Sequence, residues 1–308
     1  MTCLDKFTGC LVGLATGDGL GAPIEEINFV KKNYPPPEKR PVYDMIGGGA
    51  FQVKPGQITD DTERTLNLAR SLVACKGFNH EEIAQRDVQW VFDSAIGSGS
   101  TTRAALQRIK EGYSVYEAAQ CEKCLNSLGN GTIMSCAPIG LYDCKHADQL
   151  EAHSRDYSRI THPHPDCVDS CVFLTTLITS LINGKDKQLA FESALYATKG
   201  NAVLYHLYYL IPISKDYPHV NGEVKATIIT ATHAVLSTNT FEDAVLKAVN
   251  MGGDADTRGA VAGAIAGSLY GEKAIPEKWK TKLQDRHGHP IHHELASLAA
   301  GLYELAQR

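Results

Sequence analysis

The chain has 308 residues, of which 43% are hydrophobic and 21% charged, and its formal net charge is -5 at pH 7. A chain of this length can bury a large core as one or two domains, so we expect a stably folded globular enzyme. The acidic balance provides no broad positive field that would hold polyanions, which argues against nucleic acid as a partner.

The first 19 residues do not predict a secretory signal. They contain only Lys6 before a short apolar stretch, which Asp5 and Asp18 interrupt. No uninterrupted apolar segment reaches the ~18 residues of a membrane span, so no membrane partner is expected. Nine cysteines, an odd number without a repeating framework, suggest reduced thiols. We therefore expect a cytoplasmic protein without disulfides.

Apolar residues recur mostly at helical spacing. In the first segment they are Leu4, Phe7, Leu11 and Leu14, and Gly9 and Gly13 offer small surfaces for close helix packing. Asn79, Ser114 and Thr240 each precede an acidic residue three positions later, a pattern that predicts a helix start.

The long apolar stretches 167–182, 226–236 and 261–270 show no strand-like alternation, and no Asn-Gly or Asp-Gly joins neighbouring strand-like runs. The proline-rich stretch 34–37 predicts an exposed loop, and 215–222 a surface connection. No long linker or tandem repeat divides the chain. We predict an all-α fold in which residues 1–308 form one compact multi-helix domain.

Two acidic clusters each precede a predicted helix. The first is Thr59-Asp60-Asp61-Thr62, and the second is the segment 252–259, Gly-Gly-Asp-Ala-Asp-Thr-Arg-Gly. Carboxylates are favoured at a helix N-terminus by its dipole and unpaired N–H groups, so helix capping is one interpretation. Alternatively, two carboxylates two residues apart on a glycine-rich turn, such as Asp254 and Asp256, can converge on one cation.

Magnesium prefers oxygen ligands, takes few protein carboxylates and keeps several waters, and manganese accepts similar sites. Two helix starts that each offer two aspartates and a threonine hydroxyl make a candidate site for two metal ions. Four carboxylates gathered in one cleft repel each other unless cations neutralise them, so we expect the clusters to act together.

Further motifs accompany these clusters in a fixed order. They are Gly17-Asp18-Gly19-Leu20-Gly21 followed by Glu25, then 59–62, Gly97-Ser98-Gly99-Ser100-Thr101-Thr102, Gly129-Asn130-Gly131 with Met134, Thr161-His162-Pro163-His164-Pro165, and 252–257. With these elements, from Leu4 to about Gly271, the chain resembles the ADP-ribosylglycohydrolase family. That family contains ADP-ribosylarginine hydrolase, ADP-ribosylserine hydrolase and the enzyme that reactivates dinitrogen reductase.

The resemblance implies an all-α bundle-like fold, two Mg²⁺ or Mn²⁺ ions, and hydrolysis of the bond between C1″ of ADP-ribose and an acceptor side chain. The implied metal ligands are Thr59, Asp60, Asp61, Asp254, Asp256 and Thr257. Glu25 matches a glutamate that in several members contacts the metal site and assists catalysis, although some arginine-specific members lack it. Glu25 and Asp60 are the predicted catalytic residues.

The predicted substrate-binding residues are Gly97, Ser98, Gly99, Thr101, Gly129, Asn130, Gly131 and His162. Glycine-freed backbone N–H groups before the predicted helix 103–110 suit pyrophosphate oxygens, although a plain connecting loop fits the same residues. A dinucleotide-binding fold is excluded because no strand precedes this loop and the third glycine is missing. The resemblance places the turn 129–131 beside the ribose.

His162 could hydrogen-bond the ribose hydroxyls or the leaving side chain. Both His162 and His164 also suit a turn that enters a helix before Asp166, and zinc ligation lacks further cysteines or histidines at the required spacing. Two positions depart from the family pattern. Ser135 stands where many relatives have arginine, and Gly97 where some bacterial relatives have aspartate.

Two other groups of cysteines or histidines do not require a redox or metal site. Cys121 and Cys124 have CxxC spacing but no second pair, which favours two cysteines on a helix. The histidines at 287, 289, 292 and 293 fit a polar connection into the last helix.

The resemblance implies a hydrolase that removes ADP-ribose from modified protein side chains. No Ser-His-Asp or Cys-His arrangement competes with the acidic clusters for the catalytic role. Asp60 or Glu25 would assist the attacking water. The segment 161–165 favours arginine linkage, whereas Glu25 is shared with members that act on serine or on the nitrogenase system. The alternatives are hydrolysis of O-linked ADP-ribose (serine, poly-ADP-ribose or O-acetyl-ADP-ribose) and a non-catalytic, crystallin-like ADP-ribose-binding protein.

Overall fold

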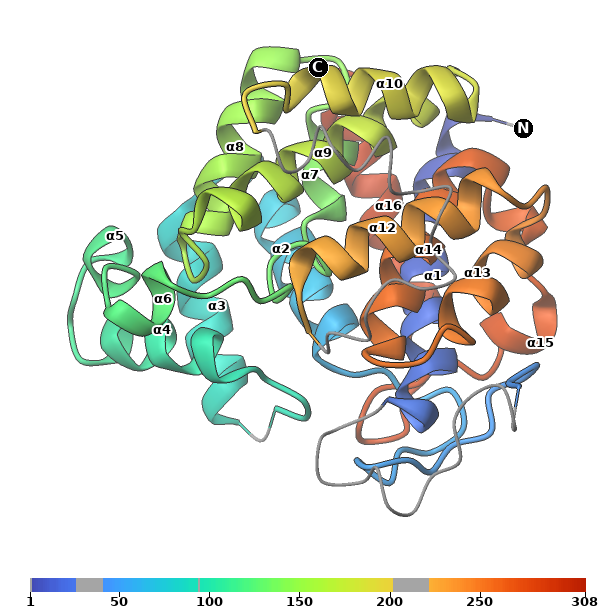
Figure 1. Cartoon of the computed structure of the whole chain (residues 1–308), viewed down its shortest axis with the longest axis horizontal. Coiled ribbons are helices and arrows are strands. Elements are labelled where there is room, and N and C mark those ends of the chain that lie inside the picture. The colour runs from blue at the N-terminus through green and yellow to red at the C-terminus, as the bar shows by residue number, and fades with distance from the viewer. Residues whose placement is uncertain (1, 26–40, 94, 202–221) are drawn as a thin grey trace.

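The computed structural model of the protein describes residues 2–25, 41–93, 95–201 and 222–308. Its regular elements there are α-helices and short 3-10 turns, and β-pairing is limited to isolated bridges such as that between Gly129 and Glu223. The predicted all-α fold is confirmed (Figure 1). The elements are α1 (Cys3–Gly21), η1 (Ala22–Ile24), α2 (Asp60–Cys75), α3 (His80–Phe92), α4 (Ser100–Lys110), α5 (Val115–Ala118), α6 (Glu122–Leu125), α7 (Ala137–Tyr142), α8 (Ala147–Arg159), α9 (Pro165–Ile182), α10 (Lys187–Ala197), α12 (Val224–Leu236), α13 (Phe241–Val249), α14 (Ala255–Tyr270), η4 (Glu272–Ala274), α15 (Glu277–Lys280) and α16 (His292–Leu305).

The centre of the molecule is the antiparallel pair of α1 and α14, which lie side by side in Figure 1. Small residues meet along the whole contact: Gly9 faces Gly267, Gly13 faces Gly263, Gly17 faces Gly259, and Gly21 faces Ala255. A Cβ atom on Gly17 would lie 1.9 Å from the carbonyl oxygen of Gly259, so the two backbones touch directly. This contact sets the C-terminal end of α1 beside the N-terminal end of α14.

The other helices surround this pair. α9 packs against α7, α8, α10, α12 and α14. It is long and apolar enough to cross a membrane, but 72% of it is buried inside the protein, as in the core helix of a globular fold. The short helices α5 and α6 pack with α4, and α3 contacts both α4 and α5, at the left of Figure 1.

The start of α2 is held from two sides. Ile58, one residue before the first acidic cluster, donates its backbone N–H to the carbonyl of Gln284, at 3.1 Å. α2 itself packs on α1, α3, α7 and α16. The cluster is therefore anchored to segments at both ends of the chain.

The predicted helix starts are confirmed. Asn79 accepts from the N–H of Glu82, Ser114 forms a capping box with Glu117, and Thr240 accepts from the N–H of Asp243. All nine cysteines are free thiols, as expected. The proline-rich stretch 34–37 and nearly all of the segment 215–222 lie outside the described residues.

Gly17→Ala tests the central helix contact. The new methyl group would collide with backbone, which cannot rotate away, and overpacking of this kind costs roughly 1–3 kcal/mol of the free energy of unfolding. We expect urea denaturation to show that loss. Gly200→Ala is the control, because a Cβ there meets open space. Equal losses in the two variants would contradict the account of the contact.

Candidate metal centre and active site

A cavity of about 260 Å³ lies at the starts of α2, α4 and α14. Most of the residues predicted for the site line it: Glu25, Asp60, Asp61, Gly97, Gly99, Thr101, Gly129, Asn130, Gly131, His162, Asp254, Asp256 and Thr257. Ser100, Thr102, Met134 and Gly222 line it as well. Two predicted residues are not among those that line it: Thr59, which is fully buried next to Asp61, and Ser98, whose hydroxyl oxygen is buried. Two distant parts of the chain thus meet in one cavity.

Neither acidic cluster caps its own helix. Thr59 is the N-cap residue of α2 and Asp254 that of α14, yet neither side chain makes a capping hydrogen bond. Within the second cluster, Asp256 accepts the N–H of its neighbour Thr257 at 2.8 Å, which is not the N-cap bond to the residue three positions later. The capping interpretation therefore does not account for these carboxylates.

The turn before α14 aims the second cluster into the cavity. Gly252 and Gly253 have φ values of 72° and 69°, which favour glycine. The buried Arg258 donates to the carbonyl of Gly252 and packs against Gly253, so the turn is held from within its own helix.

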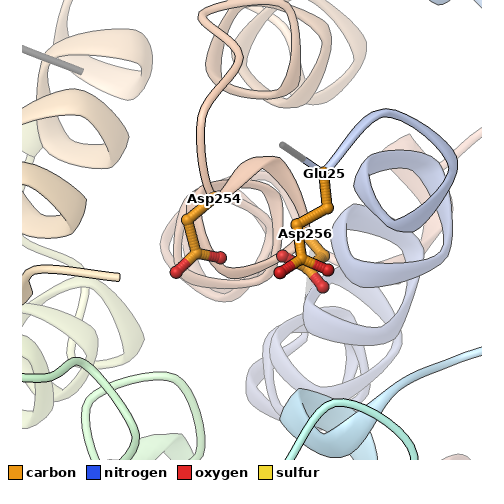
Figure 2. Close-up of side chains that lie close together, drawn as sticks. All are labelled: Glu25, Asp254 and Asp256. Atoms are coloured by element: carbon orange, nitrogen blue, oxygen red, sulfur yellow. The ribbon is translucent and has the colours of Figure 1, made fainter. Parts of the chain in front are cut away.

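Glu25 joins this cluster from the end of η1, the 3-10 turn that follows α1. Oxygen atoms of Glu25, Asp254 and Asp256 lie within 4.8 Å of one another. In Figure 2 the carboxyl groups of Glu25 and Asp256 lie together. Asp254 projects beside them from the start of α14, the segment that also carries Asp256. These three residues could hold one metal ion.

Burial and mutual repulsion raise the pKa values of the carboxyl groups. Burial, with the carboxylates of Asp254 and Asp60, raises the pKa of Glu25 to about 8. Burial, with the carboxylate of Asp18, raises the pKa of Asp60 to about 8, although the Arg64 guanidinium opposes that shift. In the folded protein these carboxylates therefore bind a proton, or another cation, more readily than free carboxylates do.

Asp61 and Asp256 show the same effect. Burial, and then the neighbouring carboxylates, raises the pKa of both well above its usual value. In addition, Asp61 Oδ1 and Glu25 Oε2 are buried without a hydrogen-bond partner. Buried oxygens that lack a donor and repel their neighbours fit a hard divalent cation, for which carboxylate oxygen is the preferred ligand.

Asp18 is a site-forming residue that the sequence analysis did not assign. It lies on α1 and is fully buried. Its carboxylate accepts hydrogen bonds from the backbone N–H groups and hydroxyls of Thr59 and Thr62, at 2.5–3.2 Å. The sequence does contain a sign of this role. An aspartate in the mostly apolar second half of a buried helix requires hydrogen-bond donors from neighbouring segments.

Asn130 holds a carboxylate of the centre. Its side-chain amide donates to Asp254 Oδ2 at 2.7 Å and to the hydroxyl of Thr227 at 3.0 Å, and its backbone N–H donates to Gly222. Both amide protons are therefore engaged by the protein. Asn130 orients Asp254 and lines the cavity at the same time.

Gly97 lies against the first cluster. Its φ is 85°, and a Cβ there would lie 2.4 Å from Asp60 Oδ1. A side chain at this position would displace the Asp60 carboxylate, which explains why glycine stands here in this chain.

His162 is packed on the other glycine turn. Its ring lies against Gly129 and Gly131, and its Nδ1 shares a 2.8 Å hydrogen bond with the hydroxyl of Thr161. Burial, with the charge of Arg64, lowers the pKa of His162 to about 3. The ring is therefore neutral at physiological pH and serves as a hydrogen-bonding group rather than as an acid.

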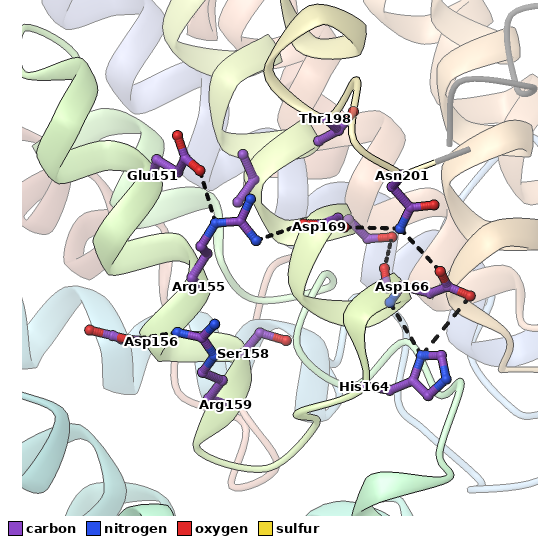
Figure 3. Close-up of polar contacts among 12 residues, drawn as sticks. Glu151, Arg155, Asp156, Ser158, Arg159, His164, Asp166, Asp169, Thr198 and Asn201 are labelled. Atoms are coloured by element: carbon purple, nitrogen blue, oxygen red, sulfur yellow. Dashed lines mark hydrogen bonds and ion pairs between the residues drawn. The ribbon is translucent and has the colours of Figure 1, made fainter. Parts of the chain in front are cut away.

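His164 has the helix-entry role. It is the N-cap residue of α9, and its Nδ1 accepts the N–H of Asp166 at 3.2 Å. Asp166 also binds Asn201, which contacts Asp169, and Arg155 joins Asp169 at 2.7 Å (Figure 3). This network fixes the start of α9 and with it the segment that carries His162.

At Ser135, where many relatives have arginine, the hydroxyl shares a 2.6 Å hydrogen bond with Tyr157. The buried guanidinium of Arg64 instead reaches this region from α2: it pairs with Asp87 and donates to the carbonyl of Gly131. Arg64 thus links the helix of the first acidic cluster to the turn beside the cavity.

The raised pKa values predict how the metal-free protein responds to pH. Between pH 6.5 and about 8 the folded protein holds protons on Glu25 and Asp60 that the unfolded chain has released, so its stability decreases as pH rises. His162 opposes this trend only below about pH 6.5, its usual pKa. Thermal denaturation in EDTA across this window measures the slope.

Glu25→Gln should reduce that slope, because the amide does not titrate, and added Mg²⁺ or Mn²⁺ should raise the midpoint more at pH 8 than at pH 6.5. A midpoint in EDTA that rises with pH across this window would contradict the prediction.

Comparison with known proteins agrees with the geometry. A model of the ADP-ribosylglycohydrolase family matches residues 1–308. The chain is 33% identical to the ADP-ribosylarginine hydrolase Tri1 of Serratia proteamaculans, over 98% of this chain and 80% of that protein. It is 32% identical to the ADP-ribosyl-dinitrogen reductase glycohydrolase of Rhodospirillum rubrum, over 96% of each. A solved structure described as an ADP-ribosylglycohydrolase-related protein complex aligns over 99% of both chains, with a TM-score of 0.81 and 30% identity. The chain therefore belongs to the ADP-ribosylglycohydrolase family and is a hydrolase that acts on glycosyl bonds.

Proposed function

We propose that this enzyme removes ADP-ribose from arginine side chains of proteins and that it does so with two Mg²⁺ or Mn²⁺ ions. The observation that carries the metal dependence is the set of cavity carboxylates that no helix uses as caps, with oxygens of Asp61 and Glu25 buried and unpartnered. The names of the two relatives, one an ADP-ribosylarginine hydrolase, support the substrate.

The residues that would hold the ions come from two helix starts. Thr59, Asp60 and Asp61 precede or begin α2, and Asp254, Asp256 and Thr257 precede or begin α14. Bound divalent cations of this kind polarise sugar oxygens and lower the pKa of a coordinated water. Asn130 and Arg258 keep the second group in place through Asp254 and the glycine turn.

The cavity suits the distal ribose rather than a whole dinucleotide, because its volume of about 260 Å³ is below that of most sites for larger ligands. Gly129, Gly131 and the neutral His162 would contact the ribose. The pyrophosphate would lie at the N-terminus of α4, where the N-cap Gly99 has no side chain and the helix supplies free N–H groups.

Glu25 is the group placed to handle the proton. In the reaction a water oxygen bonds to C1″ while the bond from C1″ to the guanidine nitrogen breaks, and the water loses a proton. Glu25, which the bound cations would keep ionised, accepts that proton and passes it to the departing guanidine.

Asp256→Ala should abolish most of the release of free ADP-ribose. Loss of one ligand and its charge should weaken Mn²⁺ binding and reduce turnover by roughly 100-fold or more. The matched control is Asp148→Ala, which removes an exposed aspartate from the first turn of α8. Turnover by Asp256→Ala equal to that of the control at saturating magnesium would disprove the metal role.

A substrate panel tests the acceptor. ADP-ribosyl-arginine, an ADP-ribosyl-serine peptide and O-acetyl-ADP-ribose are each incubated with Mg²⁺, Mn²⁺ or EDTA. We expect cleavage of the arginine conjugate, with either metal and not with EDTA. Cleavage of the serine peptide alone would overturn the arginine assignment, and no cleavage of any substrate would favour a binding protein.

A further inference from the structure

Asp18 occupies the junction between α1 and the start of α2. Its Oδ1 accepts the hydroxyl of Thr59 at 2.8 Å, and its Oδ2 accepts the hydroxyl and N–H of Thr62 at 2.5 and 3.2 Å. The N–H of Thr59 lies 3.0–3.1 Å from both oxygens. The carboxylate is thus surrounded by hydrogen-bond donors although it is fully buried.

These bonds replace the ordinary cap of α2. A threonine at the N-cap position usually accepts the N–H of the residue three positions later, which here is Thr62. Thr59 has the extended backbone of an N-cap, with φ -117° and ψ -161°, but its side chain makes no capping bond. Asp18 accepts that N–H instead, so α2 is capped by another helix.

The replacement changes what the Thr59 hydroxyl can do. A hydroxyl has one proton and two lone pairs, and the proton of Thr59 is directed to Asp18 by the 2.8 Å contact. Asp61 Oδ2 lies farther from the same hydroxyl oxygen, at 3.4 Å, so Asp18 rather than Asp61 is the main acceptor of the Thr59 proton. Both the Thr59 lone pairs and the Asp61 carboxylate remain available for a cation.

We propose that Asp18 is a positioning residue for the metal centre: by capping α2 from α1 and taking the Thr59 proton, it prepares Thr59 and Asp61 as oxygen ligands. This inference rests on the proposed metal-dependent function. α1 then positions both clusters: Asp18 holds the start of α2, and the neighbouring Gly17 packs against Gly259 of α14.

A purely structural cap would stabilise α2 without any effect on metal affinity, so the two roles can be separated. In Asp18→Asn the amide nitrogen cannot accept a hydrogen bond, so one of the two threonines loses its acceptor. If the nitrogen faces Thr59, it donates to the hydroxyl and occupies a lone pair. Thr62→Val is the matched control, because it removes a bond to Asp18 and leaves Thr59 untouched.

The experiment titrates each purified variant with Mn²⁺, follows free Mn²⁺ by electron paramagnetic resonance, and measures urea unfolding in EDTA. We expect Asp18→Asn to raise the Kd for Mn²⁺ by roughly 10- to 100-fold, as for other residues that orient metal ligands. Thr62→Val should lower the unfolding midpoint and leave the Kd near that of the unmodified protein. Asp18→Ala removes both acceptor oxygens whatever the orientation of an amide, so equal Kd values in Asp18→Ala and Thr62→Val would overturn the inference.

Thr59→Val provides the second arm and does not depend on the folding of Asp18→Asn. It should weaken Mn²⁺ binding by itself, and adding Asp18→Asn should weaken it little further, because both changes remove the same ligand. Additive effects, or normal binding by Thr59→Val, would overturn the inference. Absence of Mn²⁺ binding by the unmodified protein would instead disprove the proposed metal dependence, which keeps the two failures distinct.

Discussion

The direct backbone contact between α1 and α14 is the constraint on which the rest of the structure depends. Glycines at every fourth position of α1, from Gly9 to Gly21, let the two helices approach until their carbonyls touch the facing glycines. A contact this close allows neither helix to slide or rotate. The end of α1 is consequently locked beside the start of α14, and Glu25 is brought to Asp254 and Asp256.

This arrangement brings together carboxylates that repel one another. Groups on the protein side of the cavity wall reduce that repulsion. Helix N-termini lie under both acidic clusters and favour negative charge. Arg64 and Arg258, both buried, supply fixed positive charge next to the clusters, and Asp18 is stabilised by donors rather than by a cation. The remaining unpartnered oxygens point to a cation as the missing partner in the proposed function.

The walls of the cavity follow from the same principle of close packing. Gly97 leaves room for Asp60, and Gly129 and Gly131 leave room for the ring of His162. A side chain at Gly97 or Gly131 would collide with Asp60 or His162, so these glycines allow the two polar side chains to line the cavity. The start of α9, fixed by Asp166 and its partners, keeps His162 in place without drawing on the acidic centre.

Local patterns in the sequence were sufficient for the helical class, the helix starts at Asn79, Ser114 and Thr240, and the two candidate clusters, because capping and periodicity depend on residues within a turn or two. Ordered motifs were sufficient for the family. Contacts between distant residues were not predictable in this way. Only the tertiary structure placed Asp18 on Thr59, Asn130 on Asp254 and Arg64 on Gly131, because each hydrogen bond joins segments 41 to 124 positions apart whose approach is decided by helix packing.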